Sequence, residues 1–428
     1  MNHYSTLSLG EKIMHVRKAK GLSQENLAHA LKRNRPFVQR IENGQAQCTA
    51  EMLAVIKKFL EIENAPLLER ELALFRDQIW VLNDYSSADR TSEARAMLNE
   101  MSSILDLPFE QDLNLLYAMV EVRLLNIERN YIAAEEKLSK VEPLINDPSN
   151  DVLALYHRNK GSLYLVRGDH KNGLRHLLKT LDLVSNNVKL DARILYFIGY
   201  SYICIGKPYQ AMTFLEHAKK EFKEDLTHIL GSNLNAMLAM SYWFIGSYNK
   251  AETLLEASIA QAKIIGSDFT VRQFLSYMGD LKAKVGNYNE ALAYSDQALA
   301  YDHGDRSITA ILSNKAYCFV KMKEYAKCRE VIEALKALAE GDEHTIMTYE
   351  AFEHIMTLNS SDSSAYIEDV IIPYFRAGGG GKKMFALDLC KELETHYKNK
   401  KSKIKALSMA ATIREIYEEM FLLEDDLV

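Results

Sequence analysis

Hydrophobic residues recur every three or four positions along most of the chain, a spacing that predicts amphipathic helices. Between residues 8 and 62 these positions fall in short clusters, which predicts four or five compact helices. Ser23 and Asn34 stand where helix N-caps are expected, and Gly21 and Gly44 stand where helices end. Beyond residue 65 the helical pattern continues in longer segments. The pattern as a whole predicts an all-α fold.

The part of the chain after residue 65 contains an internal repeat. A small residue returns every 37 to 40 residues, at Ala94, Ala134, Gly173, Ala211, Ala251, Ala291 and Cys328. In the clearest units it follows a second small residue, a tyrosine and a turn glycine, as at Gly199, Tyr202 and Gly206. Two antiparallel helices pack closely only where small residues occupy their crossing. The period therefore predicts stacked helical hairpins that form a right-handed tetratricopeptide-type α-solenoid.

Two less regular hairpins, roughly 343–376 and 382–422, extend this array, so that residues 66–428 are expected to hold about seven to nine hairpins. Between these two hairpins, Gly378–Gly381 and the two lysines after it could be mistaken for a phosphate-binding loop. No Ser or Thr follows the lysines and no strand precedes the glycines, so we interpret the run as a turn between helices.

Charge divides the chain in the same place as the hydrophobic pattern. The net charge of −6 is the sum of +4 over residues 1–65 and −10 over the remainder. A basic head on an acidic body suits a head that meets phosphates. Prolines and glycines, 7 and 19 in 428 residues, are scarce enough to favour long helices.

Several classes of site are not indicated. The five cysteines are scattered, which predicts neither a disulfide framework nor a zinc site. We find no Ser/His/Asp arrangement, metal-ligand set or carboxylate pair, so neither enzymatic activity nor a cofactor is expected. No segment approaches about 18 consecutive apolar residues. The start of the chain also lacks the apolar core of a signal peptide, and we expect a cytoplasmic protein without a membrane partner.

Residues 22–45, LSQENLAHALKRNRPFVQRIENGQ, resemble the helix-turn-helix of the phage-repressor (XRE) family. The matching positions are Leu22, Gln24, Leu27, Ala28, Leu31, Val38, Arg40, Ile41, Glu42 and Gly44. Lys32 stands where the turn of that family usually has Gly, so it is expected to adopt a left-handed backbone at a modest cost. Arg33 replaces a small apolar residue. The resemblance predicts a four- or five-helix DNA-binding domain over residues 1–65.

The resemblance also assigns roles to side chains. The helix from about Arg35 to Glu42 would lie in the major groove of double-stranded DNA, with Arg35, Phe37 and Gln39 facing base edges. Gln24 and Arg40 are better placed for backbone phosphates. Arg17 is expected to form a partly buried ion pair with Glu42. The alternative is a basic helical domain that contacts only protein.

In a solenoid of hairpins the first helix of each pair lines a concave groove. Asn159 and Asn314 share one repeat position, two residues before the small residue of their units. An asparagine amide there can hold the backbone of an extended peptide, because it offers both a donor and an acceptor. The other positions predicted to face the groove are Arg158, Tyr196, Tyr200, Asn233, Gln273, Asp280 and Tyr317. The tyrosines can equally belong to the core.

A repressor-type helix-turn-helix followed directly by such an array resembles the RRNPP family of peptide-sensing regulators of Gram-positive bacteria, over nearly the whole chain. The resemblance implies a quorum-sensing transcription regulator that forms a homodimer or a higher homo-oligomer. It implies that residues 66–428 bind a short imported signalling peptide, which controls DNA binding. A response regulator of the sporulation phosphorelay is a further partner known in this family.

Two alternatives within related proteins stay open. A Rap-like repeat protein acts on a response regulator, as a phosphatase or by sequestration, but begins with a three-helix bundle instead of a DNA reader. A phage lysogeny switch regulator of the AimR type shares the domain order of this chain. Neither the operator nor the peptide follows from the sequence.

Overall fold

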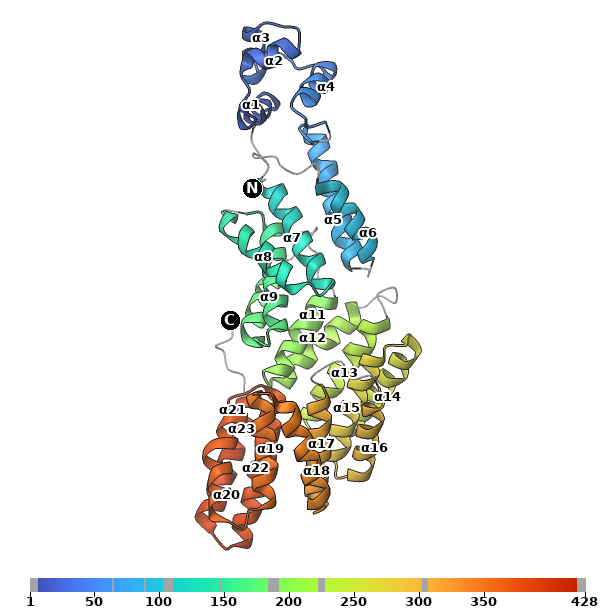
Figure 1. Cartoon of the computed structure of the whole chain (residues 1–428), viewed down its shortest axis with the longest axis vertical. Coiled ribbons are helices and arrows are strands. Elements are labelled where there is room, and N and C mark those ends of the chain that lie inside the picture. Colours follow the sequence, from blue (N-terminus) through green and yellow to red (C-terminus); the bar gives the residue numbers. More distant parts are fainter. Residues whose placement is uncertain are drawn as a thin grey trace. The chain divides into compact units, whose positions relative to one another are not determined.

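The computed structural model of the chain describes residues 7–63, 65–87, 90–102, 111–146, 148–183, 192–221, 228–301 and 307–421. The regular structure over these ranges is helical throughout, which confirms the predicted all-α fold (Figure 1). The chain divides into two compact units, residues 1–190 and 191–428, and each is described by itself. None of the helices in the described ranges combines the length and apolar character that a membrane span requires.

Four short helices open the first unit: α1 (Leu9–Ala19), α2 (Gln24–Ala30), α3 (Arg35–Glu42) and α4 (Ala50–Phe59). Ser23 and Asn34 cap α2 and α3 as predicted, since their side chains accept hydrogen bonds from the backbone N–H groups of Asn26 and Phe37. Pro36 lies in the first turn of α3, where its missing N–H leaves no bond unmade. The caps define where each of these helices begins.

The turn between α2 and α3 places Lys32 in the left-handed region, with a φ of 53°. The sequence predicted this conformation because Lys32 replaces the usual glycine. A residue with a Cβ atom pays roughly 1–2 kcal/mol to adopt it. An apolar core beneath the turn joins the four helices, and it includes Ile13, Leu27, Val38, Ile41 and Ile56.

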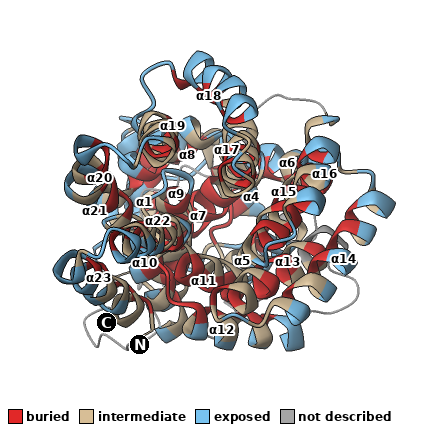
Figure 2. Ribbon diagram, turned by 90° about the horizontal axis from the view of Figure 1, so that it is seen from below, coloured by how far each residue is buried: buried red, intermediate tan, exposed pale blue. Residues whose placement is uncertain are grey.

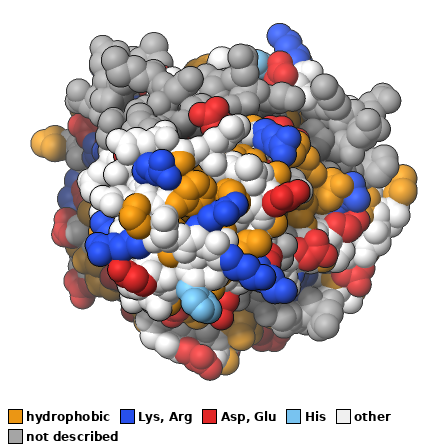
Figure 3. All heavy atoms as spheres, turned by 90° about the horizontal axis from the view of Figure 1, so that it is seen from above, with side chains coloured by type: hydrophobic (Ala, Val, Ile, Leu, Met, Phe, Trp, Pro, Cys, Tyr) orange, Lys and Arg blue, Asp and Glu red, His pale blue; other side chains and the backbone are white. Residues whose placement is uncertain are grey.

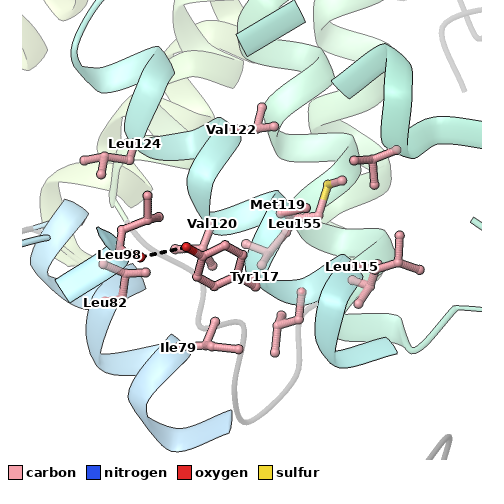
Figure 4. Close-up of a cluster of buried hydrophobic side chains, with 14 of the residues drawn as sticks. Ile79, Leu82, Leu98, Leu115, Tyr117, Met119, Val120, Val122, Leu124 and Leu155 are labelled. Atoms are coloured by element: carbon pink, nitrogen blue, oxygen red, sulfur yellow. Dashed lines mark hydrogen bonds between the residues drawn. The ribbon is translucent and has the colours of Figure 1, made fainter. Parts of the chain in front are cut away.

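Three helical hairpins complete the first unit: α5 (Glu69–Ser87) with α6 (Thr91–Ser102), α7 (Gln111–Ile127) with α8 (Tyr131–Val141), and α9 (Asn150–Val166) with α10 (His170–Asp182). A short 3-10 helix, η1 (Glu142–Leu144), follows α8. Helix α7 contacts α5, α6, α8 and α9, and is buried around most of its circumference. In this core the hydroxyl of Tyr117 donates to the carbonyl of Leu98 over 2.7 Å (Figure 4).

The second unit continues with α11 (Ala192–Cys204), α12 (Pro208–Glu221), α13 (His228–Phe244), α14 (Tyr248–Ile265), α15 (Asp268–Lys284), α16 (Tyr288–Leu299), α17 (Ser307–Lys321) and α18 (Tyr325–Ala339). It ends with α19 (Glu343–Met356), α20 (Ser361–Tyr366), the π-helical turn η2 (Ile367–Ile371), α21 (Ile372–Arg376), α22 (Gly380–Asn399) and α23 (Lys403–Phe421). The described part of the chain thus contains the hairpins that the repeat predicts, with the second helix of one late hairpin broken into three pieces.

Consecutive first helices of these hairpins contact one another: α11 with α13, α13 with α15, and α15 with α17. The second helices pack instead against the first helix of the next hairpin. Contact between neighbouring first helices means that the array curves with these helices on its concave side. Figure 2 agrees, since α12, α14 and α18 lie at the periphery and carry exposed residues there. We call the concave surface of α11, α13, α15 and α17 the inner face.

The small residues of the repeat lie at the helix crossings. A Cβ atom added to Gly161 of α9 would lie 3.2 Å from the carbonyl oxygen of Gly173 of α10. A Cβ atom added to Gly173 would lie 3.2 Å from the carbonyl oxygen of Gly161. A Cβ atom on Gly199 would collide with the side chain of Leu215. Fully buried small residues take the corresponding place in other hairpins, namely Ala94, Ala134, Ala211, Ala251, Ala291 and Cys328. This confirms the predicted reason for the period.

Most of the described hairpin turns contain a left-handed residue. Gly168, Gly206, Gly246 and Gly286 hold this position with φ angles of 79°, 82°, 81° and 88°. Arg129, Lys323 and Lys401 occupy the same position in three other hairpins, with φ angles of 61°, 61° and 59°. Among the described turns, four therefore use glycine here, and three bear the strain of a side chain.

The last hairpin of the second unit folds back onto its first. Gly379 and Gly380 lie against the C-terminal end of α11, where an added Cβ atom would overlap the carbonyl oxygen of Cys204 or of Ile203. Glycine is thus the only residue that lets α22 approach this closely. The sequence predicted a turn at this run and gave no sign of the packing. We call this contact the α22 seat.

Two ion pairs hold α22 to other first helices of the unit. The Lys284 Nζ atom of α15 lies 2.5 Å from the Asp388 Oδ1 atom, and Lys321 of α17 pairs with Glu392. Since all four side chains are less than one-third exposed, these pairs are partly shielded from water and from salt.

Candidate functional site

Helix α3 presents three exposed polar side chains, Arg35, Gln39 and Arg40. The Arg35 Nη1 atom lies 3.4 Å from the Glu25 Oε1 atom, and the two side chains are 62% and 63% exposed. Exposed pairs of this kind contribute less than about 1 kcal/mol. Arg35 can therefore exchange Glu25 for another acceptor at little cost.

Phe37 is half-buried on the same helix, and two guanidinium groups lie near its ring. The Cζ atoms of Arg33 and Arg40 each lie 5.7 Å from the centroid of its ring. The sequence did not predict this contact of Arg33, which lies in the turn before α3. In the view of Figure 3, taken from the α3 end, Lys and Arg side chains lie among hydrophobic ones, with some acidic side chains between them. Such a surface suits a polyanion with flat bases.

The predicted ion pair between Arg17 and Glu42 is present and buried. Gln24 joins it, since its Nε2 atom donates to the Glu42 Oε2 atom over 2.8 Å. The Gln24 Oε1 atom accepts from the Arg35 Nε atom over 3.3 Å. Gln24 therefore links the buried pair to the exposed face of α3, and its predicted contact with phosphate stays a prediction.

Tyrosines gather on the inner face of the second unit. Tyr196 and Tyr200 stack on α11 with ring centroids 6.5 Å apart, and the Tyr200 hydroxyl donates to the thiol of Cys204. Burial, and then the nearby Tyr277 and Cys204, raise the pKa of Tyr196. Tyr277 belongs to α15, two hairpins further along, so it meets Tyr196 only across the concavity. Tyr196, Tyr200 and Tyr277 are partly exposed, yet burial raises the pKa of each hydroxyl. This combination is expected for side chains that line a recess.

One stripe of α15 carries Gln273, Tyr277 and Asp280. The Gln273 Nε2 atom donates to the Tyr277 hydroxyl over 2.9 Å. Gln273 and Asp280 were predicted from the sequence and Tyr277 was not. The signal was available, because residues four and seven positions apart share one side of a helix.

Asp280 and Asn314 connect two neighbouring first helices. The Asn314 Nδ2 atom of α17 donates to the Asp280 Oδ1 atom of α15. Burial raises the pKa of Asp280 to about 7, although the hydrogen bond from Asn314 opposes the shift. Asn314 is 7% exposed, so its amide acts first as a partner of Asp280.

Two other predicted positions of this unit lie outside that cluster. Tyr317 lies beside α22: burial, and then the carboxylate of Asp388, raise its pKa. The Lys321 Nζ atom lies 5.4 Å from its ring centroid. Asn233 is half-buried on α13. The unit thus brings Tyr196, Tyr200, Gln273, Asp280 and Asn314 to the inner face and leaves Tyr317 at the α22 contact.

Arg158 and Asn159 belong to α9 of the first unit. Asn159 is only 1% exposed, and its Nδ2 atom donates to the carbonyl of Met119 on α7 over 2.7 Å. Arg158 is half-buried, and its backbone carbonyl accepts from the hydroxyl of Ser162. The shared repeat position of Asn159 and Asn314 thus serves contacts between successive first helices, and in this conformation Asn159 presents no free amide to a peptide.

A polar site on the first unit was not foreseen. The Nδ1 atoms of His157 and His176 lie 2.8 Å apart, and burial lowers the pKa of His157 to about 4. One ring must donate and the other accept, with both neutral at pH 7.

A cavity of about 420 Å³ opens nearby, lined by Glu135, Glu136, Leu138, Ser139, Glu142, Lys160, Leu163, Tyr164 and Arg167. Across the described ranges, no three His, Cys, Asp or Glu side chains are grouped to hold a metal ion.

Comparison with known proteins gives similarity only in structure. No protein-family model matches the sequence, and no curated protein sequence matches it. The apo form of the quorum sensor NprR from B. thuringiensis has a TM-score of 0.62 and 21% identity, covering 82% of this chain and 99% of NprR. NprR in complex with its cognate peptide NprX has a TM-score of 0.60 and 21% identity, covering 72% and 91%.

A Rap protein complexed with competence and sporulation factor has a TM-score of 0.64 and 14% identity, covering 82% of this chain and 98% of the Rap chain. At these identities the similarity establishes the fold. The length and repeat count of the sequence resemble those of NprR, which is a member of the RRNPP family and one of its structural neighbours. The chain therefore has the helical-repeat fold of NprR and the Rap proteins, which are members of the RRNPP family that its sequence resembles.

Proposed function

We propose that this chain is a cytoplasmic transcription regulator that binds double-stranded DNA through α3 and is controlled by a short imported peptide bound on the inner face. The observation that carries the proposal is the capped helix α3, whose exposed Arg35, Gln39 and Arg40 stand on a rigid helix-turn-helix core. The fold shared with peptide-binding quorum sensors supports the second half.

In the proposed DNA complex, Arg35 pairs with the O6 and N7 edge of guanine, and Gln39 hydrogen-bonds a neighbouring base edge. Phe37 offers the rim of its ring to a thymine methyl group. Arg40 and Gln24 contact phosphates, which position the helix without selecting a sequence. Arg33, held beside Phe37, is an additional cation for the backbone.

In the proposed peptide complex, the tyrosines of α11 pack against apolar side chains of the peptide. Gln273, Asp280 and Asn314 provide hydrogen bonds from α15 and α17. Peptides of this kind bind in an extended form, so that side chains on alternate positions meet the protein. Asn159 is left out of this contact set because its amide is already bonded.

Control of DNA binding requires that the peptide favour one arrangement of two protomers over another. Two α3 helices bind together only where they reach successive major grooves, about 34 Å apart. We propose that peptide binding changes the curvature of the array and thereby the spacing of α3 helices in a homodimer.

The test is selection of sites from random duplex DNA by the purified full chain, with and without peptides encoded beside its gene. We expect enrichment of a site with two half-sites. The Arg35→Ala, Gln39→Ala double variant should lose the enrichment, while Arg414→Ala, which removes an exposed arginine from α23, should keep it. Enrichment of no site under either condition would overturn the proposal.

The alternative is Rap-like action on a response regulator, and the similarity in fold to a Rap protein favours it. It predicts that the chain binds a response regulator or accelerates loss of its phosphoryl group, and that DNA selection yields no site. The resemblance of residues 22–45 to a helix-turn-helix is the feature against it.

A further inference from the structure

Asp280 is the acidic side chain of the inner-face cluster and is partly accessible there. Its Oδ1 atom accepts from Asn314. Across the described residues no Lys, Arg or His side chain acts on its pKa, either through a hydrogen bond or through charge. The carboxylate is therefore both desolvated and without a cationic partner.

Other acidic residues of the same unit form ion pairs with lysines. Asp388 pairs with Lys284, and Glu392 pairs with Lys321. The Lys282 Nζ atom lies 2.7 Å from a carboxylate oxygen of Glu252 and also of Glu290. These acids have cations, so the absence of one at Asp280 is not a general property of this region.

The position of Lys284 sharpens the contrast. It follows Asp280 by four residues on α15, the spacing at which opposite charges commonly pair on a helix. Its Nζ atom instead lies 2.5 Å from the Asp388 Oδ1 atom on α22. The fold thus pairs Lys284 with Asp388, and Asp280 has the amide of Asn314 as its partner instead.

A desolvated carboxylate without a counter-charge is costly in the free protein, and a bound cation would remove that cost. Tyr277 lies beside it on α15, and tyrosine rings also attract cations through their faces. We infer that Asp280 receives a cationic group of the bound peptide, either its amino terminus or a Lys or Arg side chain. This inference rests on the peptide binding proposed above.

The titratable groups near Asp280 do not compete for this role. Tyr277 on its own helix has a pKa raised by burial, and the pKa of the Cys318 thiol on α17 is raised by burial to about 12. Both are neutral near pH 7. The neighbouring α16 contributes the hydroxyl of Ser295, 3.5 Å from the Asn314 Oδ1 atom. In the described part of α13 and α16, no charged group affects the pKa of Asp280.

The probe is a positional-scanning library of synthetic heptapeptides, prepared with free and with acetylated amino termini and titrated against the full chain. Lys is compared with norleucine and Arg with citrulline at each position. We expect a preference of at least about tenfold for positive charge at one position, or for the free amino terminus, corresponding to one charge-assisted contact. The arm that shows the preference identifies which cation is bound.

The same titrations on Asp280→Asn should lose the charge preference and keep the affinity for neutral peptides. Asp296→Asn, which removes an equal charge from an exposed site on α16, should keep the preference. The wild-type affinity for the preferred cationic peptide should also rise between pH 6 and pH 8 as Asp280 loses its proton, and that of Asp280→Asn should not.

Peptide binding without a charge preference in the wild type, or an equal preference in Asp280→Asn, would overturn the inference and leave peptide binding standing. Absence of binding by every pool would overturn the proposed peptide function itself, and this inference with it. If Asp280→Asn does not fold, as judged by circular dichroism, the wild-type charge preference and its pH dependence decide the question alone.

Discussion

Arg17 and Glu42 are joined by two parallel hydrogen bonds beneath helix α3, Nε to Oε1 over 2.6 Å and Nη2 to Oε2 over 2.9 Å. The side chains are 7% and 1% exposed. The third donor, Arg17 Nη1, reaches the carbonyl of Leu22 over 2.6 Å. One guanidinium group therefore fixes α3 against α1 and against the segment that leads into α2.

Removal of one partner of this pair should strongly destabilise the four helices α1–α4. In Glu42→Ala the buried guanidinium has no counter-charge, which typically costs about 3–5 kcal/mol. The double variant Arg17→Met, Glu42→Leu should lose less, because it buries no charge. Hydrogen exchange of residues 9–42 in the full chain measures both. Equal exchange in the single and double variants would contradict this account.

The α22 seat should be sensitive to one methyl group. Gly380→Ala places a Cβ atom against the carbonyl oxygen of Ile203 and the ring of Phe244. Overpacking of this kind costs roughly 1–3 kcal/mol. The matched control is Gly381→Ala, where the added Cβ atom meets nothing within 4 Å. Thermal unfolding should separate the two variants, and an equal melting temperature for both would show that α22 moves away without cost.

Asp280 should make stability depend on pH. Its pKa in the folded chain is about 7, against about 3.9 when unfolded. Between these values the folded chain holds a proton that the unfolded chain has lost, so stability falls as pH rises from 4 to 7. Asp280→Asn should therefore gain stability over the wild type as pH rises through this window, and little at pH 4. Urea unfolding at pH 4, 6 and 8 tests this, with Asp296→Asn as the control that shows no such gain.

Strain in the hairpin turns should be removable. Lys323→Gly relieves a left-handed side chain and should stabilise the array by roughly 1 kcal/mol. Gly246→Ala imposes the same strain where no neighbour lies within 4 Å of the new Cβ atom, and should destabilise by a similar amount. Opposite shifts of the urea midpoint are expected. Shifts of the same sign would mean that contacts, and not backbone strain, decide these positions.

Local features of this fold were predictable from the sequence because they depend on neighbours in the chain. The caps at Ser23 and Asn34, and the left-handed Lys32, follow from residue type at a known turn. The small residues of the repeat are also local in effect, since each acts where its own hairpin crosses. The ion pair of Arg17 and Glu42 was also predictable, because both residues belong to the motif that one short domain resembles.

Side-chain partners from different hairpins were not predictable. Asn159 reaches Met119, 40 residues earlier, and Asn314 reaches Asp280, 34 residues earlier. These bonds depend on the offset between successive hairpins, which the period does not specify. The packing of Gly380 was not predictable either, because no residue near it in the sequence indicates that the end of α11 is its neighbour.

Repeat arrays usually behave as linear chains in which each hairpin contacts only the adjacent ones, so that their ends can fray independently. The contact between α22 and α11 changes that topology within the second unit, since its last hairpin is held by its first. Loss of the final helices would also uncover the start of the unit. We therefore expect residues 192–421 to unfold in a single concerted transition instead of peeling from the end.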